Sequence, residues 1–177
     1  CDVVVFGDEP HEVWDEFFEE HKVAYRTYPV SRNGMNPLSD LNTKRALKKL
    51  LIEEKPDKVW TYQVKPNIYG CIAAHEIGIK DIYVMMGGLG SVFRATDPKS
   101  RIIRAIVSAE YRLAMRYAKN VFFQNLEDVE LFVKLGILNR DKVVLTRGSG
   151  VNVSTYPQAE FPAQMRFLFV GRLVRGK

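Results

Sequence analysis

The sequence contains few of the features that would place it outside ordinary globular proteins. Its two cysteines, Cys1 and Cys71, are too few for a disulfide scaffold, and we expect Cys71 to pack as a small apolar residue in a reducing compartment. No apolar run approaches the roughly 18 residues that a membrane span needs. No signal peptide, internal repeat or low-complexity tract is visible. With 46% hydrophobic residues among 177, the composition is that of a domain with a sizeable core.

Motifs for metal binding and for nucleophilic catalysis are also missing. The three histidines lack the spacing of metal ligands, and no Ser/His/Asp or Cys/His arrangement can be argued from the sequence. We therefore expect no metal and no cofactor. The net charge of +5 favours an anionic partner. No RNA-binding aromatic motif, zinc spacing or basic heptad is present, which argues against nucleic acid.

Short apolar runs alternate with helical segments along the whole chain. Strands are predicted at 2–6, 24–30, 58–62, 81–86, 121–124, 143–146 and 167–170, and helices at 11–21, 41–54, 66–77, 100–118 and 126–135. Strands separated by helices imply right-handed βαβ units and a parallel sheet. The predicted fold class is therefore α/β, with a doubly wound, Rossmann-like parallel sheet covered on both faces.

Residue types at the helix ends support these boundaries. Ser39 or Asp40 is the candidate N-cap of the helix at 41–54, and Pro56 is its stop. Asn125 is the predicted N-cap of the helix at 126–135, and Gly136 closes it.

We expect three parts in the chain. Residues 1–152 form the α/β domain, 153–164 read as an interdomain linker with two prolines and no periodicity, and 165–177 begin a second domain. Because the chain starts at Cys1 rather than Met, we expect a segment to precede it.

Ligands of parallel sheets bind beyond the carboxyl ends of the strands. Polar and glycine-rich loops fall at those ends, at 7, 61–65, 87–91, 124–125 and 148–152. The run at 87–90 lacks the glycine spacing of the dinucleotide fingerprint. A loop that lies close against a ligand is therefore the favoured interpretation. Lys65 stands before Pro66 at the start of a helix, where a lysine and free N–H groups can bind an anion. A solvated lysine beside a proline-started helix is the alternative reading.

Cations cluster in two further places. The predicted helix at 100–118 carries an arginine stripe, made of Arg101, Arg104, Arg112 and Arg116. Such a stripe suits the surface of an anionic bilayer, although a solvated face is the alternative. At the end of the sequence, an apolar run and Gly171 are followed by Arg172 and Lys177. A strand with a glycine and cations after it suits a diphosphate.

Six stretches resemble, in the right order, the N-terminal half of a retaining, nucleotide-sugar-dependent glycosyltransferase of family 4. These enzymes have two facing Rossmann-like domains, the GT-B fold. The stretches are 31–37, 61–70, 88–93, 122–125, 148–152 and 169–173. Lys-Pro-Asn-Ile-Tyr-Gly at 65–70 and Gly-Leu-Gly at 88–90 are similar to the subgroup acting on polyprenyl-diphosphate-linked sugars for capsule, O-antigen or exopolysaccharide.

The resemblance implies a role for each site. The domain present here would bind the acceptor, and a further domain, begun at 165–177, would bind the nucleotide-sugar. A strand-helix unit would precede residue 2, and this chain alone would be inactive. By this resemblance, Arg172 and Lys177 would bind the donor diphosphate. The cleft would be lined by Gly148, Ser149, Gly150 and Val151. The acceptor would be bound by Lys65, Asn67, Gly88, Leu89 and Gly90. No catalytic residue is assigned.

The leading hypothesis is a peripheral membrane enzyme at the inner face of the cell membrane. It would move a sugar, with retention, from a nucleotide-diphosphate-sugar to a lipid-linked saccharide in surface polysaccharide synthesis. One alternative keeps the architecture but uses a soluble acceptor, or epimerises a nucleotide-sugar. The other is an acceptor-binding module without catalysis.

Overall fold

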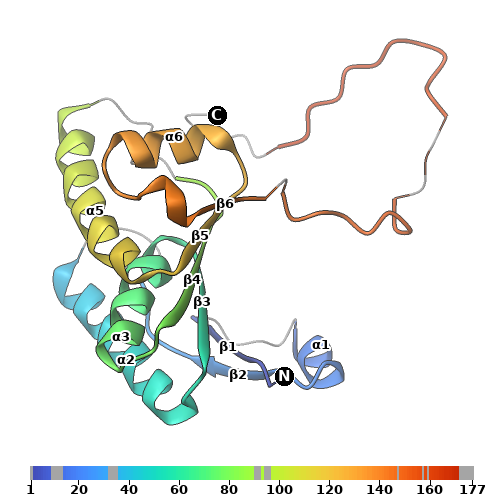
Figure 1. Ribbon diagram of the computed structural model, residues 1–177. Coiled ribbons are helices and arrows are strands. Elements are labelled where there is room, and N and C mark those ends of the chain that lie inside the picture. Colours follow the sequence, from blue (N-terminus) through green and yellow to red (C-terminus); the bar gives the residue numbers. More distant parts are fainter. Residues whose placement is uncertain are drawn as a thin grey trace.

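The computed structural model describes residues 2–8, 14–31, 36–89, 93, 97–146, 148–156, 158 and 160–171. They form two parallel sheets (Figure 1). The smaller sheet pairs β1 (Val4–Gly7) with β2 (Ala24–Thr27). The larger sheet has the order β3-β4-β5-β6, with β3 (Lys58–Tyr62), β4 (Asp81–Met86), β5 (Asn120–Phe123) and β6 (Val143–Leu145). The predicted α/β class with a parallel sheet is confirmed.

Helices connect the strands. They are α1 (Asp15–Glu20), α2 (Pro37–Glu54), the π-helical turn η1 (Pro66–Gly70) that continues into α3 (Cys71–Glu76), α5 (Pro98–Tyr117), α6 (Leu126–Lys134) and the 3-10 turn η2 (Arg140–Lys142). The predicted single helix at 66–77 is thus a π-helical turn followed by an α-helix. Single π-helical turns of this kind are frequently found at functional sites.

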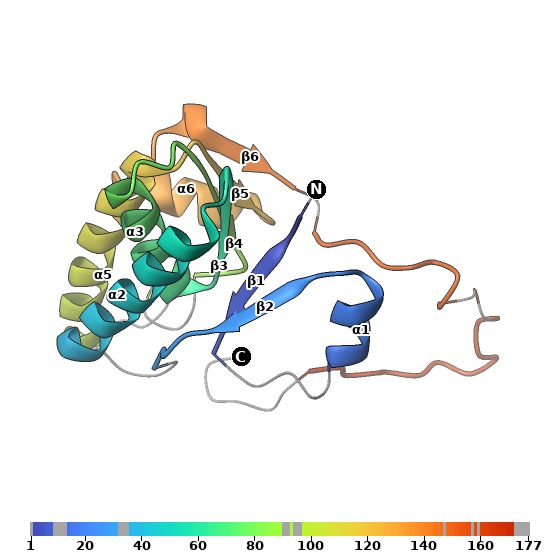
Figure 2. The ribbon, with the colours of Figure 1, turned by 90° about the horizontal axis from the view of Figure 1, so that it is seen from below.

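The helices of the larger sheet gather on one face. Figure 2 shows α2, α3 and α5 on one side of this sheet, and β1, β2 and α1 on the other. The reason is the strand order, because right-handed crossovers between strands that follow one another in sequence place every helix on the same side. The second helical layer of a doubly wound sheet is therefore not built by the described residues. On that face Trp60 and Tyr62 remain 56% and 50% exposed.

The core lies between the larger sheet and its helices. Phe132 of α6 packs edge-on against Phe123 of β5 and Tyr111 of α5, with ring centroids 5.6 and 5.3 Å apart. Cys71 is completely buried, and burial raises the pKa of its thiol to about 12. Its predicted role as a small core residue is confirmed.

The start of α2 differs from the prediction. Asn36 is the N-cap, since its Oδ1 accepts hydrogen bonds from the backbone N–H groups of Leu38 and Ser39 at 3.1 and 3.4 Å. The predicted caps, Ser39 and Asp40, therefore lie inside the first turn. The helix starts earlier because Pro37 fits the first helical position, where no N–H is needed. At the other helix Asn125 caps α6 as predicted, accepting from Asp128 N–H at 2.8 Å.

The predicted strand at 167–170 is wrong for this structure. These residues form no strand, and Phe167 and Val170 are 94% and 84% exposed. Figure 1 shows the chain after β6 running away from the domain. A strand exists only when its backbone groups pair with a neighbour, and no described strand lies beside this segment. The predicted division into domain, linker and second domain stays a prediction.

Candidate functional site

Positive φ angles occur after three strands of the larger sheet, as well as at several helix ends. Gln63, directly after β3, has a φ of +78°, although it carries a side chain. Its carbonyl accepts a hydrogen bond from the Asn67 N–H at 2.9 Å, an α-helical bond just before the π-helical turn. After β4 and β6, Gly88, Gly148 and Gly150 have φ values of +129°, +95° and +75°. Strained backbone of this kind is often found at functional sites.

Gly87 lies against the side chain of Tyr62. A Cβ atom at Gly87 would lie 2.6 Å from the Tyr62 hydroxyl oxygen, so the half-exposed tyrosine ring lies directly over this glycine. Next to it Gly88 is exposed and Leu89 is buried, whereas Gly90 lies outside the described residues. The loop predicted to lie close against a ligand therefore begins with Gly87, and Gly87 is already in contact with the Tyr62 side chain of β3.

Lys65 is neither solvated nor without a partner. Its Nζ lies 2.7 Å from Oδ1 of Asp40 in the first turn of α2, and the two side chains are only 15% and 12% exposed. Lys65 itself has helical backbone angles and forms the N-cap position of η1. The early start of α2, fixed by Asn36, brings Asp40 within reach of the lysine.

A second polar pair lies one turn further along. The Tyr69 hydroxyl donates a hydrogen bond to Oε1 of Glu110 on α5 at 3.0 Å. Burial is the largest influence on Glu110 and raises the pKa of its carboxyl; the Asp40 charge raises it further, while Tyr69 and Lys65 oppose the shift. The pKa of Tyr69 is raised by burial, and by Glu110 and Asp40. We call Asp40, Lys65, Tyr69 and Glu110 the polar cluster.

Sequence reasoning missed three members of the polar cluster. Asp40 was considered only as a helix cap, and no role was expected for Tyr69 or Glu110. No spacing signal could have found the last pair, because the two residues are 41 positions apart. A Glu between apolar residues in the middle of α5 was the one local hint.

Asn67 has a structural position. Its side chain is 1% exposed, and Nδ2 donates to the Met85 carbonyl at 3.0 Å, which joins η1 to β4. Its Oδ1 has no hydrogen-bond partner in the described part of the chain. Acceptor binding by Asn67 remains a prediction that this buried orientation does not favour.

The glycine loop after β6 is held by the neighbouring strand. Gln124 Nε2 donates to the Ser149 hydroxyl at 3.0 Å, and the Thr146 N–H donates to the Phe123 carbonyl at 2.7 Å. All four predicted cleft residues are exposed, namely Gly148, Ser149, Gly150 and Val151. The predicted diphosphate ligands Arg172 and Lys177 lie outside the described residues.

The arginine stripe of α5 divides into two kinds of residue. Arg112 donates to the carbonyls of Leu135 and Gly136 at 2.9 and 3.1 Å and so closes the end of α6, while Arg104 donates to the Phe93 carbonyl at 3.3 Å. Arg101 and Arg116 are exposed, and within the described part of the chain their side chains donate to no backbone carbonyl. The outer face of α5 also carries three exposed apolar residues, Ile102, Ile106 and Leu113.

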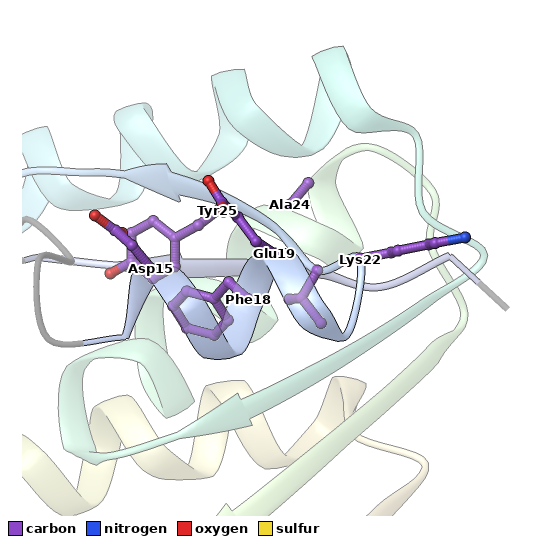
Figure 3. A pocket seen from close by; sticks show the side chains of 7 residues that line it. Asp15, Phe18, Glu19, Lys22, Ala24 and Tyr25 are labelled. Carbon is purple, nitrogen blue, oxygen red and sulfur yellow. The ribbon is translucent and has the colours of Figure 1, made fainter.

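Two open grooves in the described part of the chain lie away from these residues. One, of about 330 Å³, lies between α1 and β2 (Figure 3), where Phe18 and Tyr25 are surrounded by Asp15, Glu19 and Lys22. Another, of about 470 Å³, lies beside the ends of α2 and α3 that face away from the strand-end loops. Neither is lined by a predicted site residue. Within the described ranges, no three His, Cys, Asp or Glu side chains are arranged to hold a metal ion.

Known proteins resemble both the sequence and the fold. No protein-family model matches the chain. Over 165 residues it is 24% identical to the N,N'-diacetylbacillosaminyl-diphospho-undecaprenol alpha-1,3-N-acetylgalactosaminyltransferase of Campylobacter jejuni, a match that covers 93% of this chain and 44% of that protein. The crystal structure of Acinetobacter baumannii MurG has a similar fold, with a TM-score of 0.52 at 15% identity, over 89% of this chain and 39% of that chain.

These findings confirm the predicted resemblance to a two-domain glycosyltransferase of the GT-B type. The Rossmann-like architecture is shared with MurG, and the enzyme class that the chain resembles is glycosyltransferase. The chain spans less than half of the length of either protein it matches.

Proposed function

We propose that this chain is the acceptor-side domain of a glycosyltransferase that moves a sugar from a nucleotide-diphosphate-sugar to a polyprenyl-diphosphate-linked saccharide. The observation that carries the proposal is the match over 93% of the chain to an enzyme named for such a lipid-linked acceptor. The strained and glycine-rich strand ends support it, since they lie where parallel sheets bind ligands.

The acceptor diphosphate would be bound beside the end of β3. Lys65 supplies the cation, and the loop with Gly88, Leu89 and Gly90 lies after the neighbouring strand β4. A charge-assisted contact from an ammonium group to a phosphate oxygen is among the strong hydrogen bonds of proteins.

The donor would be bound mainly by a second domain. In this proposal Arg172 and Lys177 neutralise the diphosphate that leaves with the nucleotide, and residues 148–151 line the cleft near the reacting sugar. The reaction retains configuration without a protein nucleophile. Its product belongs to a surface polysaccharide such as capsule or exopolysaccharide.

We further propose that the enzyme works as a peripheral protein on the cytoplasmic face of the membrane. Within the described residues no helix is long and apolar enough to cross a bilayer. On α5, Ile102, Ile106 and Leu113 could enter the lipid interface while Arg101 and Arg116 meet anionic headgroups. Arg104 and Arg112, which were also predicted to face the membrane, are left out of this proposal because they donate to backbone carbonyls.

Sugar transfer by the full-length protein tests the proposal. Purified enzyme would be offered nucleotide-sugars with an undecaprenyl-diphosphate-linked acceptor, and products would be separated by chromatography. A lengthened lipid-linked saccharide is expected, and Arg172→Ala should abolish it. Transfer to the water-soluble saccharide alone, an epimerised nucleotide-sugar, or normal turnover by Arg172→Ala would each contradict the proposal.

A further inference from the structure

The polar cluster contains more negative than positive groups. Lys65 is its one cation, and it faces two carboxyl groups, Asp40 from α2 and Glu110 from α5. Asp40 takes the direct contact with the ammonium at 2.7 Å, whereas Glu110 is held by the Tyr69 hydroxyl at 3.0 Å. Asp40 acts electrostatically on both Glu110 and Tyr69, and Lys65 acts on Glu110. The four side chains therefore behave as one coupled group.

This arrangement bears on how Lys65 can bind a ligand. An ammonium already paired with a carboxylate attracts another anion only weakly, because the pair is close to neutral. The Asp40 oxygen stands at the distance at which a phosphate oxygen would bind the same Nζ. The pair is also mostly buried, so little of the ammonium group is open to an incoming anion while Asp40 stays in place.

We propose that Asp40 is an internal occupant of a diphosphate site, which it holds until the diphosphate of an acceptor displaces its carboxylate from Lys65. This inference rests on the proposed function, because it takes Lys65 as the contact of the acceptor diphosphate. The displacement would make the site selective between anions of different charge. A singly charged anion gains no more from Lys65 than Asp40 does, whereas a diphosphate brings several charges and displaces it.

Titration calorimetry on the full chain tests the displacement. The probes are geranyl diphosphate and inorganic pyrophosphate, which share the diphosphate and differ in the lipid. Asp40→Asn removes the competing charge while keeping the shape, and it should raise the affinity for both probes about tenfold. Lys65→Ala should lower the affinity, and Asp40→Asn added to Lys65→Ala should give no gain.

Asp81→Asn is the matched control. Asp81 pairs with Lys119 at 2.6 Å, in a more exposed position at the start of β4, away from the carboxyl ends of the strands. The control makes the same change in net charge and should leave both affinities unchanged. Thermal unfolding of each variant checks the fold, and Asp40→Ala should raise the affinity in the same direction.

The outcomes separate this inference from the proposed function. If Lys65→Ala binds both probes as well as the wild type, the proposed acceptor contact is wrong. If Lys65→Ala binds more weakly but Asp40→Asn does not bind more tightly, only the displacement is overturned. It is also overturned if Asp81→Asn gives the same gain, or if the gain appears with geranyl diphosphate alone.

Discussion

The ammonium group of Lys65 lies 2.7 Å from the carboxylate of Asp40, and both side chains are largely buried. The pair connects the first turn of α2 with the turn that follows β3. Asp40→Ala would leave the lysine buried without its partner, and we expect it to lower the free energy of unfolding by about 2–4 kcal/mol. Urea denaturation measures this. Glu53→Ala, which removes the exposed partner of Lys49, should cost less than about 1 kcal/mol; equal costs would contradict the expected role of burial.

The Glu110 carboxyl gives the fold a dependence on pH. Burial raises its pKa, so the folded state holds the proton more tightly than the unfolded state does. Its contribution to stability is complete below the ordinary glutamate pKa and is lost as the pH rises through the raised value.

Glu110→Gln, which stays neutral, should therefore gain stability relative to the wild type as the pH rises from 4 to 8. Urea unfolding at several pH values measures the difference. Glu160→Gln, at an exposed position, is the control and should show no such trend. A constant difference for Glu110→Gln across the pH range would show that its burial does not matter.

The neighbouring glycines 87 and 88 should respond differently to alanine. At Gly87 the obstacle is the Tyr62 hydroxyl, 2.6 Å from the added Cβ, whereas at Gly88 nothing lies within 4 Å but φ is +129°. Gly88→Ala should cost about 1–3 kcal/mol whatever surrounds it, because the backbone is strained. The cost of Gly87→Ala should disappear in a Tyr62→Ser background. Thermal unfolding of the single and double variants measures both, and a rescue of Gly88→Ala by Tyr62→Ser would contradict the distinction.

The exposed and the engaged arginines of α5 should separate in a membrane-binding assay. Arg101→Ala and Arg116→Ala should each weaken binding to vesicles with anionic lipid by about 1 kcal/mol, and neither should change binding to neutral vesicles. Ile106→Ser should weaken binding to both kinds of vesicle.

Arg112→Ala serves as the contrast within the same helix. It removes the hydrogen bonds that close α6, so it should lower the unfolding temperature and leave vesicle binding unchanged. Co-sedimentation gives the binding and thermal unfolding gives the stability. If Arg112→Ala weakened vesicle binding as Arg101→Ala does, the division between the two kinds of arginine would be wrong.

Local patterns in the sequence were enough to predict the elements of the larger sheet. The strands at 58–62 and 81–86 have the predicted bounds, because apolar side chains there alternate between a buried face and an exposed one. Asn125 was recognised as a cap because its hydrogen bond reaches only three residues ahead. The glycine loops at the strand ends are also predictable from local sequence, because glycine adopts positive φ angles more readily than other residues do.

The tertiary structure decided what depends on distant residues. It placed Asp40 against Lys65 and Tyr69 against Glu110, over 25 and 41 positions in the chain, because helices α2 and α5 both pack beside η1. It left 167–170 without strand structure, since an apolar run becomes a strand only beside a partner. The sequence by itself thus determined which segments become strands and helices and where backbone can turn. Helix packing decided which charged side chains lie close together, because electrostatic interaction depends on distance in space and not on separation along the chain.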